Sequence, residues 1–268
     1  MKQSQAPGGR IDYIDTGQGV PFLWIHGFPL SSAVFESQLE IGGVRHIVPD
    51  LPGFGNSPHQ PSLAIDDYAK RLLALLDDLG VDTAVVGGLS MGGYIALALA
   101  RLEPRRLRAL VLIDSREVPD TPEGRENRWK QIETVKNEGT TQLIEQMLPK
   151  MLSPRTLAAA GEESRKVRAI MESASKEGVM TALAAMAVRG DSSAALRDLD
   201  VPLLVTVGDE DTITSVEDAQ RMQSLARIAS IEIIPGAAHL SNLERPREFN
   251  QAVSGFLRRH GILSGEGR

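Results

Sequence analysis

The amino-acid sequence predicts an α/β protein with a mostly parallel, doubly wound sheet of about seven or eight strands. Short runs rich in Val, Ile and Leu alternate along the chain with segments of helical periodicity. Runs this continuous are typical of parallel strands that helices cover on both faces. The expected strands are residues 22–25, 45–48, 83–86, 109–113, 203–207 and 231–234, with an antiparallel edge strand at 11–15.

Helical patterns fill several of the gaps between these strands. Residues 66–79 place apolar side chains on one face, and Gly80 follows as a C-terminal cap. Residues 91–102 are almost wholly apolar, which favours a helix packed deep against the sheet and ended before Pro104. Further helices are expected at 215–225 and 246–258.

The alternation breaks between about residues 117 and 196, which contain no convincing strand pattern. Helix-like segments lie there at 126–138, 141–151, 162–175 and 178–188. We therefore expect an α/β core of residues 1–115 and 197–268, with a helical lid of residues 116–196 inserted over the strand ends. Five of the eight methionines fall in this lid. Methionine side chains are flexible and polarisable, so they suit an apolar pocket that accepts ligands of varied shape, but they serve ordinary helix packing equally well.

Composition narrows the classes of function. The formal net charge is −6, which argues against nucleic acid as the main partner. The chain has no cysteine, so disulfides, thiolate chemistry and cysteine-ligated metals are excluded. Its first ten residues are polar and no apolar run approaches membrane-spanning length. We expect a cytoplasmic protein without a membrane span, and the sequence gives no indication of oligomeric state.

The pentapeptide Gly88-Leu89-Ser90-Met91-Gly92 fits the G-x-S-x-G nucleophile elbow. In this motif a tight strand-to-helix turn holds the serine hydroxyl above the sheet, and the turn closes only if the flanking residues lack side chains. The pentapeptide alone is weak evidence for a nucleophile, but it follows an expected buried strand and precedes an expected apolar helix. This context predicts that Ser90 is a nucleophile.

A serine hydroxyl needs a base to attack at neutral pH. Among the five histidines, His239 follows the expected strand at 231–234 and lies after the serine in the chain. A carboxylate must in turn orient that imidazole. Asp209, Glu210 and Asp211 follow the preceding strand, and the residues alone favour Asp211 with Asp209 second. Asp114, which ends an earlier strand, is a weaker alternative.

The loop His26-Gly27-Phe28-Pro29 ends another expected strand and can offer a backbone N–H to a developing oxyanion. The expected oxyanion donors are the amides of Phe28 and Met91, since Pro29 has no N–H. We expect His26 to brace this loop rather than to act as a base.

These segments together resemble α/β-hydrolases over residues 10 to 258. The resemblance rests on the loop at 26–30, the segment 50–57, the elbow around Ser90, and the segments 208–211 and 238–246. It is strongest to the bacterial 3-oxoadipate enol-lactonase-like and carboxylesterase branch. In that family the acid is the aspartate of Gly-x-x-Asp, so the resemblance selects Asp211 over Asp209. The family often has proline shortly after this aspartate, whereas Thr212 to Ser215 follow here.

The resemblance implies a serine hydrolase of carboxylic esters or lactones that needs no cofactor and no metal. Ser90 argues against dehalogenation, because related haloalkane dehalogenases carry aspartate at that position. Two alternatives are a cofactor-free, haloperoxidase-like perhydrolase and a hydrolase-like small-molecule receptor. The residues expected to line the substrate pocket are Trp129, Met147, Met151 and Leu240. Arg116 and Arg189 flank the lid, either as ligands for an acidic substrate or simply as exposed arginines.

Overall fold

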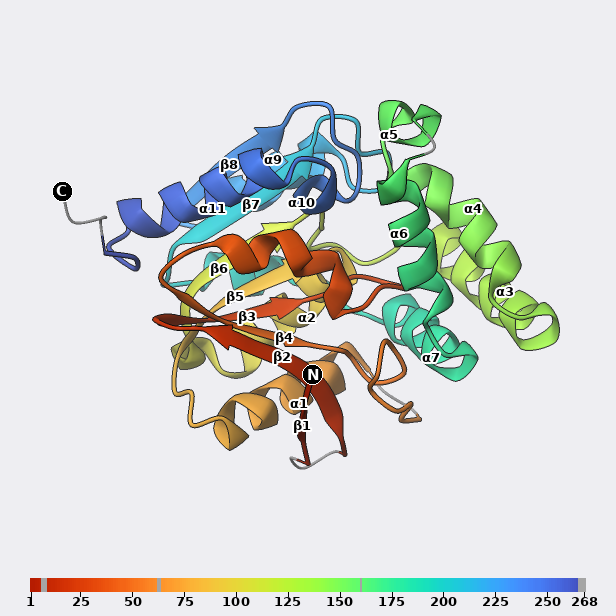
Figure 1. Cartoon of the computed structure of the whole chain (residues 1–268), viewed down its shortest axis with the longest axis horizontal. Helices are drawn as coiled ribbons and strands as arrows, with labels where there is room; N and C mark the ends of the chain where they lie inside the picture. The colour runs from red at the N-terminus through yellow and green to blue at the C-terminus, as the bar shows by residue number, and fades with distance from the viewer. Residues whose placement is uncertain (6–8, 62–63, 160, 265–268) are drawn as a thin grey trace.

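The computed structural model describes residues 1–5, 9–61, 64–159 and 161–264. Residue 160 of the expected lid and residues 6–8, 62–63 and 265–268 of the expected core therefore lie outside the described residues. The described chain forms one eight-stranded sheet in the order β1-β2-β4-β3-β5-β6-β7-β8 (Figure 1). The strands are β1 Lys2–Ser4, β2 Ile11–Gly17, β3 Val20–Ile25, β4 Val44–Pro49, β5 Ala84–Leu89, β6 Leu107–Ile113, β7 Leu203–Gly208 and β8 Ala229–Ile234.

The sheet is parallel from β4 to β8, as the apolar runs predict. β2 pairs antiparallel with β4, which confirms the predicted direction of this strand. Its predicted place at the sheet edge is wrong, because β1 pairs antiparallel with the outer side of β2. The three residues of β1 are polar and too few to show a strand period, so no sequence pattern indicates this strand.

Helices cover both faces of the sheet. The described helical elements are η1 Ser32–Glu40, α1 Ile65–Asp78, α2 Met91–Leu102, η2 Pro104–Arg106, α3 Pro122–Glu138, α4 Thr141–Met151, α5 Pro154–Ala158, α6 Glu162–Glu172, α7 Lys176–Ala187, α8 Ser193–Arg197, α9 Val216–Leu225, α10 Ser241–Glu244 and α11 Pro246–Arg259. α1, α2 and α9 pack in one apolar cluster with one face of the sheet, and η1 and α11 pack in a second cluster on the other.

Strand β3 shows how the sheet divides these two clusters. Leu23 and Ile25 belong to the cluster of α1 and α2, whereas Phe22 and Trp24 belong to that of η1 and α11. All four side chains are fully buried. Burial of each side chain of this size contributes about 1.5–3 kcal/mol, so the central strands anchor the fold. The ends of β5, β7 and β8 are thereby fixed, and these ends carry the candidate site.

The segment between β6 and β7 is helical, as predicted, and consists of α3 to α8 among the described residues. α3 begins at Pro122, earlier than expected, because Thr121 caps it by accepting the N–H of Gly124. α7 begins at Lys176 because Ser175 caps it in the same way. Figure 1 shows α3, α4, α6 and α7 grouped beside one end of the sheet. α8 instead contacts α2 and α9. Among the described residues, no helix is both long enough and apolar enough to cross a bilayer.

Candidate active site

Ser90 lies between the end of β5 and the start of α2, in a strained backbone conformation with φ 52° and ψ −113°. A Cβ added to Gly88 would lie 2.2 Å from the carbonyl oxygen of Gly92. One added to Gly92 would lie 2.1 Å from the carbonyl oxygen of Ile25. Both distances are far inside van der Waals contact, so the turn closes only with glycine at these positions. The strain holds the Ser90 hydroxyl clear of the sheet.

His239 joins Ser90 to Asp211 through its two ring nitrogens. Its Nε2 lies 2.8 Å from Ser90 Oγ, and its Nδ1 lies 2.8 Å from Asp211 Oδ2. A carboxylate only accepts, so Nδ1 carries the proton and Nε2 is left to accept from the serine. The side chains of His239 and Asp211 are 2% and 0% exposed, which shields both hydrogen bonds from water. The structure thus brings together three residues that are 28 and 149 positions apart along the chain.

The turn after β7 holds the carboxylate of Asp211 in place. Oδ1 accepts the backbone N–H groups of Ile213 and Thr214 at 2.7 and 3.0 Å. Oδ2 accepts the Thr214 hydroxyl at 2.6 Å in addition to the imidazole. Asp209 instead accepts the N–H of Gly236 in an exposed position away from the imidazole. The sequence did not reveal Thr214, although a threonine three residues after the aspartate is the signal for such a turn.

These contacts set the protonation states of His239 and Asp211. Burial lowers the pKa of His239, but the charge and hydrogen bond of Asp211 outweigh it, so the pKa stands above its ordinary value. Burial raises the pKa of Asp211, but the imidazole and the donors of Thr214 hold it below its usual range. Asp211 therefore stays ionised beside His239 at neutral pH.

Asp114, the weaker alternative acid, is fully buried next to this pair. It directly follows β6 with a positive φ of 44°, and its carboxylate accepts the N–H groups of Gly208 and Ser241 at 3.0 and 2.9 Å. Burial, with the nearby charge of Asp211, raises the pKa of Asp114 to about 7. Its hydrogen bonds tie the end of β7 to the segment after His239, so the structure gives it the contacts of a brace between the two loops.

The two expected oxyanion donors belong to the residue after the serine and to the loop that follows β3. Met91 is the first residue of α2, where backbone N–H groups have no partner within the helix. Phe28 follows Gly27, at which an added Cβ would lie 3.2 Å from Ser90 Cβ. His26 accepts the N–H of Leu51 at its Nε2 and donates from Nδ1 to the carbonyl of Gly27. Burial lowers the pKa of His26, so it braces this loop as a neutral ring, as expected.

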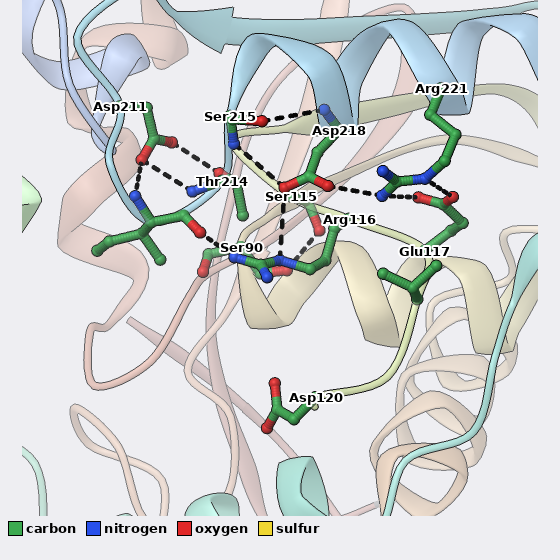
Figure 2. A network of polar contacts seen from close by, with 12 residues as sticks. Ser90, Ser115, Arg116, Glu117, Asp120, Asp211, Thr214, Ser215, Asp218 and Arg221 are labelled. Carbon is green, nitrogen blue, oxygen red and sulfur yellow. Dashed lines mark hydrogen bonds and ion pairs between the residues drawn. The ribbon is translucent and has the colours of Figure 1, made fainter. Parts of the chain in front are cut away.

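Arg116, in the loop after β6, contacts the loop that carries Asp211. Its guanidinium donates to the carbonyl of Ile213, and its Nε lies 3.8 Å from Asp218 Oδ2. Figure 2 shows this contact continuing as a network from Asp218 to Arg221 and on to Glu117. The network links the loop after β6, the turn that carries Asp211 and α9 by charge-assisted hydrogen bonds.

Arg189 is not an exposed arginine, which corrects one of the two expectations for it. Its side chain is 5% exposed, forms an ion pair with Asp120 at 2.9 Å and lies 4.1 Å over the ring of Tyr94. It also donates to the carbonyls of Met186 and Val118. These partners already bind the guanidinium, so the structure gives no support to a substrate-binding role for Arg189.

The four residues expected to line the pocket lie in different surroundings. Leu240 and Met151 are 0% and 1% exposed within the core. Met147 is partly buried and packs against both apolar clusters. Trp129 is 44% exposed on α3. Leu240 directly follows His239 in the sequence. The role of all four residues in a substrate pocket stays a prediction.

A parallel sheet whose serine, on a strained strand-to-helix turn, contacts a histidine paired with an aspartate defines the α/β-hydrolase fold. The comparisons with known proteins agree. A model described as "Alpha/beta hydrolase family" matches residues 22–252, and the chain belongs to this family.

Several known proteins are similar to the chain over most of its length. A thermophilic esterase from Thermogutta terrifontis, solved with malate bound, has a TM-score of 0.94 and 37% identity, covering 97% of this chain and 99% of that one. The 3-oxoadipate enol-lactonase 1 of Acinetobacter baylyi is 27% identical over 80% of this chain and 79% of its own. A Synechocystis protein provisionally named a non-heme chloroperoxidase is 30% identical over 92% of this chain and 94% of its own.

Proposed function

We propose that the chain is a serine hydrolase that cleaves carboxylic esters or lactones through an acyl-enzyme intermediate. The observation that carries the proposal is the continuous hydrogen-bonded series from Ser90 Oγ through His239 to Asp211, with both links at 2.8 Å. The similarity to an esterase and an enol-lactonase supports the substrate class.

In the first step Ser90 Oγ attacks the carbonyl carbon while His239 Nε2 takes the hydroxyl proton. Asp211 holds the Nδ1–H tautomer and stabilises the imidazolium that forms. The amides of Phe28 and Met91 would donate to the oxyanion, and loss of one such donor typically costs about 3–4 kcal/mol of barrier. His239 then protonates the leaving alkoxide, which leaves the acyl group on Ser90.

In the second step water attacks the acyl-enzyme, and His239 again accepts the proton. Collapse of the second tetrahedral intermediate releases the carboxylic acid and returns the proton to Ser90. The proposed steps need no metal or organic cofactor. We also infer that α3 to α7, grouped beside the sheet, act as the lid over Ser90 and decide which acyl group fits (Figure 1).

Hydrolysis of p-nitrophenyl esters of graded chain length tests this proposal. We expect multiple turnovers by the wild type and a loss of at least about 10³-fold in Ser90→Ala. A single burst equal to the protein concentration, without steady turnover, would favour the small-molecule receptor. No Ser90-dependent reaction with esters or with enol-lactones would refute the hydrolase.

Perhydrolysis is the second candidate, because the chain is similar to the provisionally named chloroperoxidase over nearly its full length. Hydrogen peroxide would replace water in the second step and release a peracid from the acyl-enzyme. Acetate, peroxide and bromide with a brominatable dye test it, and equal bromination by wild type and Ser90→Ala would exclude it.

A further inference from the structure

We propose that Glu244 is a positioning residue that ties the helical segment α3–α7 to the peptide preceding His239. The inference rests on the proposed function, because it assigns a role in aligning His239. Glu244 Oε1 accepts the backbone N–H of Ala238 at 2.7 Å, and Oε2 accepts the backbone N–H of Ser153 at 2.8 Å. Glu244 is 8% exposed, so water does not readily replace either bond.

The two amides belong to different parts of the fold. Ala238 directly precedes His239 in the loop after β8, and Glu244 ends α10, which follows that histidine. Ser153 lies between α4 and α5, 91 residues before Glu244 in the chain. One side chain therefore spans from the helical segment to the backbone that carries the candidate base.

The chemistry of the two partners requires a carboxylate. Both are N–H donors, and each of the two oxygens of Glu244 accepts one of them. A glutamine of the same shape has one oxygen and one NH₂ group, so its NH₂ must face an N–H donor. A buried N–H without an acceptor is unfavourable, and the loop would move to find another partner.

The loop of His239 is held on its other side by Asp114, which accepts the N–H of Ser241. Asp114 connects that loop to the sheet, through the N–H of Gly208 at the end of β7. Glu244 connects it to the helical segment. A shift of the turn at Ser153 is thereby transmitted to Ala238 and alters the alignment of His239 Nε2 with Ser90. Misplacement of a reacting group by about 1 Å can cost about 100-fold in rate.

Glu244→Gln tests the inference with p-nitrophenyl acetate as the substrate. We expect kcat to fall about 10- to 100-fold with little change in KM, and the acidic inflection of kcat/KM to move. The matched control is Glu163→Gln, the same substitution at an exposed glutamate that lines a cleft together with Glu244. We expect it to match the wild type. A kcat within about twofold of the wild type together with an unmoved inflection in Glu244→Gln, whatever its melting temperature, would overturn the inference.

Two substitutions at Ser153 approach the same link from the helical segment. Ser153 has φ −62° and ψ 151°, and Leu152 before it has ψ 148°, so the backbone accepts proline at 153. Ser153→Pro removes the N–H that Glu244 accepts, whereas Ser153→Ala keeps it and removes only the hydroxyl that caps α5. We expect the proline variant to lose kcat as Glu244→Gln does and the alanine variant to keep it. Equal kcat in the two would overturn the inference even if Glu244→Gln did not fold.

Hydrogen exchange separates this inference from the proposed hydrolysis. In Glu244→Gln, the peptides that contain Ser153 and Ala238 should exchange faster together, while the exposed control leaves both unchanged. Unchanged exchange in either peptide would overturn the link. If the wild type showed no Ser90-dependent turnover, the proposed function would fail, and the exchange result would still decide whether Glu244 connects the two segments.

Discussion

Replacement of Asp211 by asparagine should disable His239 without changing the shape of the site. Asp211 Oδ1 accepts two backbone N–H groups, from Ile213 and Thr214, and only an oxygen can take that position. The asparagine NH₂ must then occupy the position of Oδ2, 2.8 Å from His239 Nδ1. Nδ1 becomes the acceptor, so Nε2 carries the proton and points it at Ser90 Oγ.

A base that already carries a proton cannot take another from the serine. The equivalent change of tautomer in a serine-protease triad lowers kcat about 10⁴-fold, or about 5.4 kcal/mol of barrier, and we expect a loss of this size. The assay is kcat and KM for p-nitrophenyl acetate, with KM nearly unchanged because the substrate does not touch Asp211. Circular dichroism and the melting temperature check that the variant is folded.

Asp209→Asn is the matched control, because Asp209 is the other aspartate of the same turn. Its Oδ1 accepts the N–H of Gly236, and asparagine keeps an oxygen for this bond. A surface change of this kind stays within about 0.5 kcal/mol in the free energy of unfolding. Asp209 contacts neither His239 nor Ser90, so we expect kcat to stay within about twofold of the wild type. A loss below about tenfold in Asp211→Asn, or equal losses in the two variants, would refute the assignment of Asp211 as the acid.

Two further predictions follow from the geometry. The Asp211 charge holds the pKa of His239 above its ordinary 6.5, and His239 acts only when neutral, so kcat/KM should fall as pH decreases through an inflection above 6.5. The negative charges of Asp211 and Asp114 both favour the protonated imidazole, so a pH profile with its midpoint below 6.5 would contradict the pairing of His239 with Asp211. Gly92→Ala would place a Cβ 2.1 Å from the carbonyl oxygen of Ile25, so we expect a loss of at least about 1–3 kcal/mol in the free energy of unfolding. The control Gly42→Ala meets no atom within 4 Å and should stay within about 0.5 kcal/mol; equal denaturation midpoints would show that the elbow tolerates a side chain.

Much of the fold was predictable because it depends on local patterns. Buried parallel strands need continuous apolar runs, and β3 to β8 all contain them. α2 begins and ends at the predicted residues, since a glycine-rich turn precedes it and Pro104 follows it. β1 was missed because three polar residues acquire strand structure only by pairing with β2.

The sequence by itself determined a candidate nucleophile, Ser90, a candidate base, His239, and a choice of candidate acid among the aspartates of one turn. The glycines at 88 and 92 report a steric demand that no other residue meets, and the candidate base and acid each follow a recognisable strand. Only the tertiary structure decided which groups surround them. Three contacts show this, because each joins residues distant in the chain: Asp114 with Gly208, Arg189 with Asp120, and Glu244 with Ser153. A side chain's type gives its capacity for hydrogen bonds, but the packing of the strand ends and helices decides which of those bonds form.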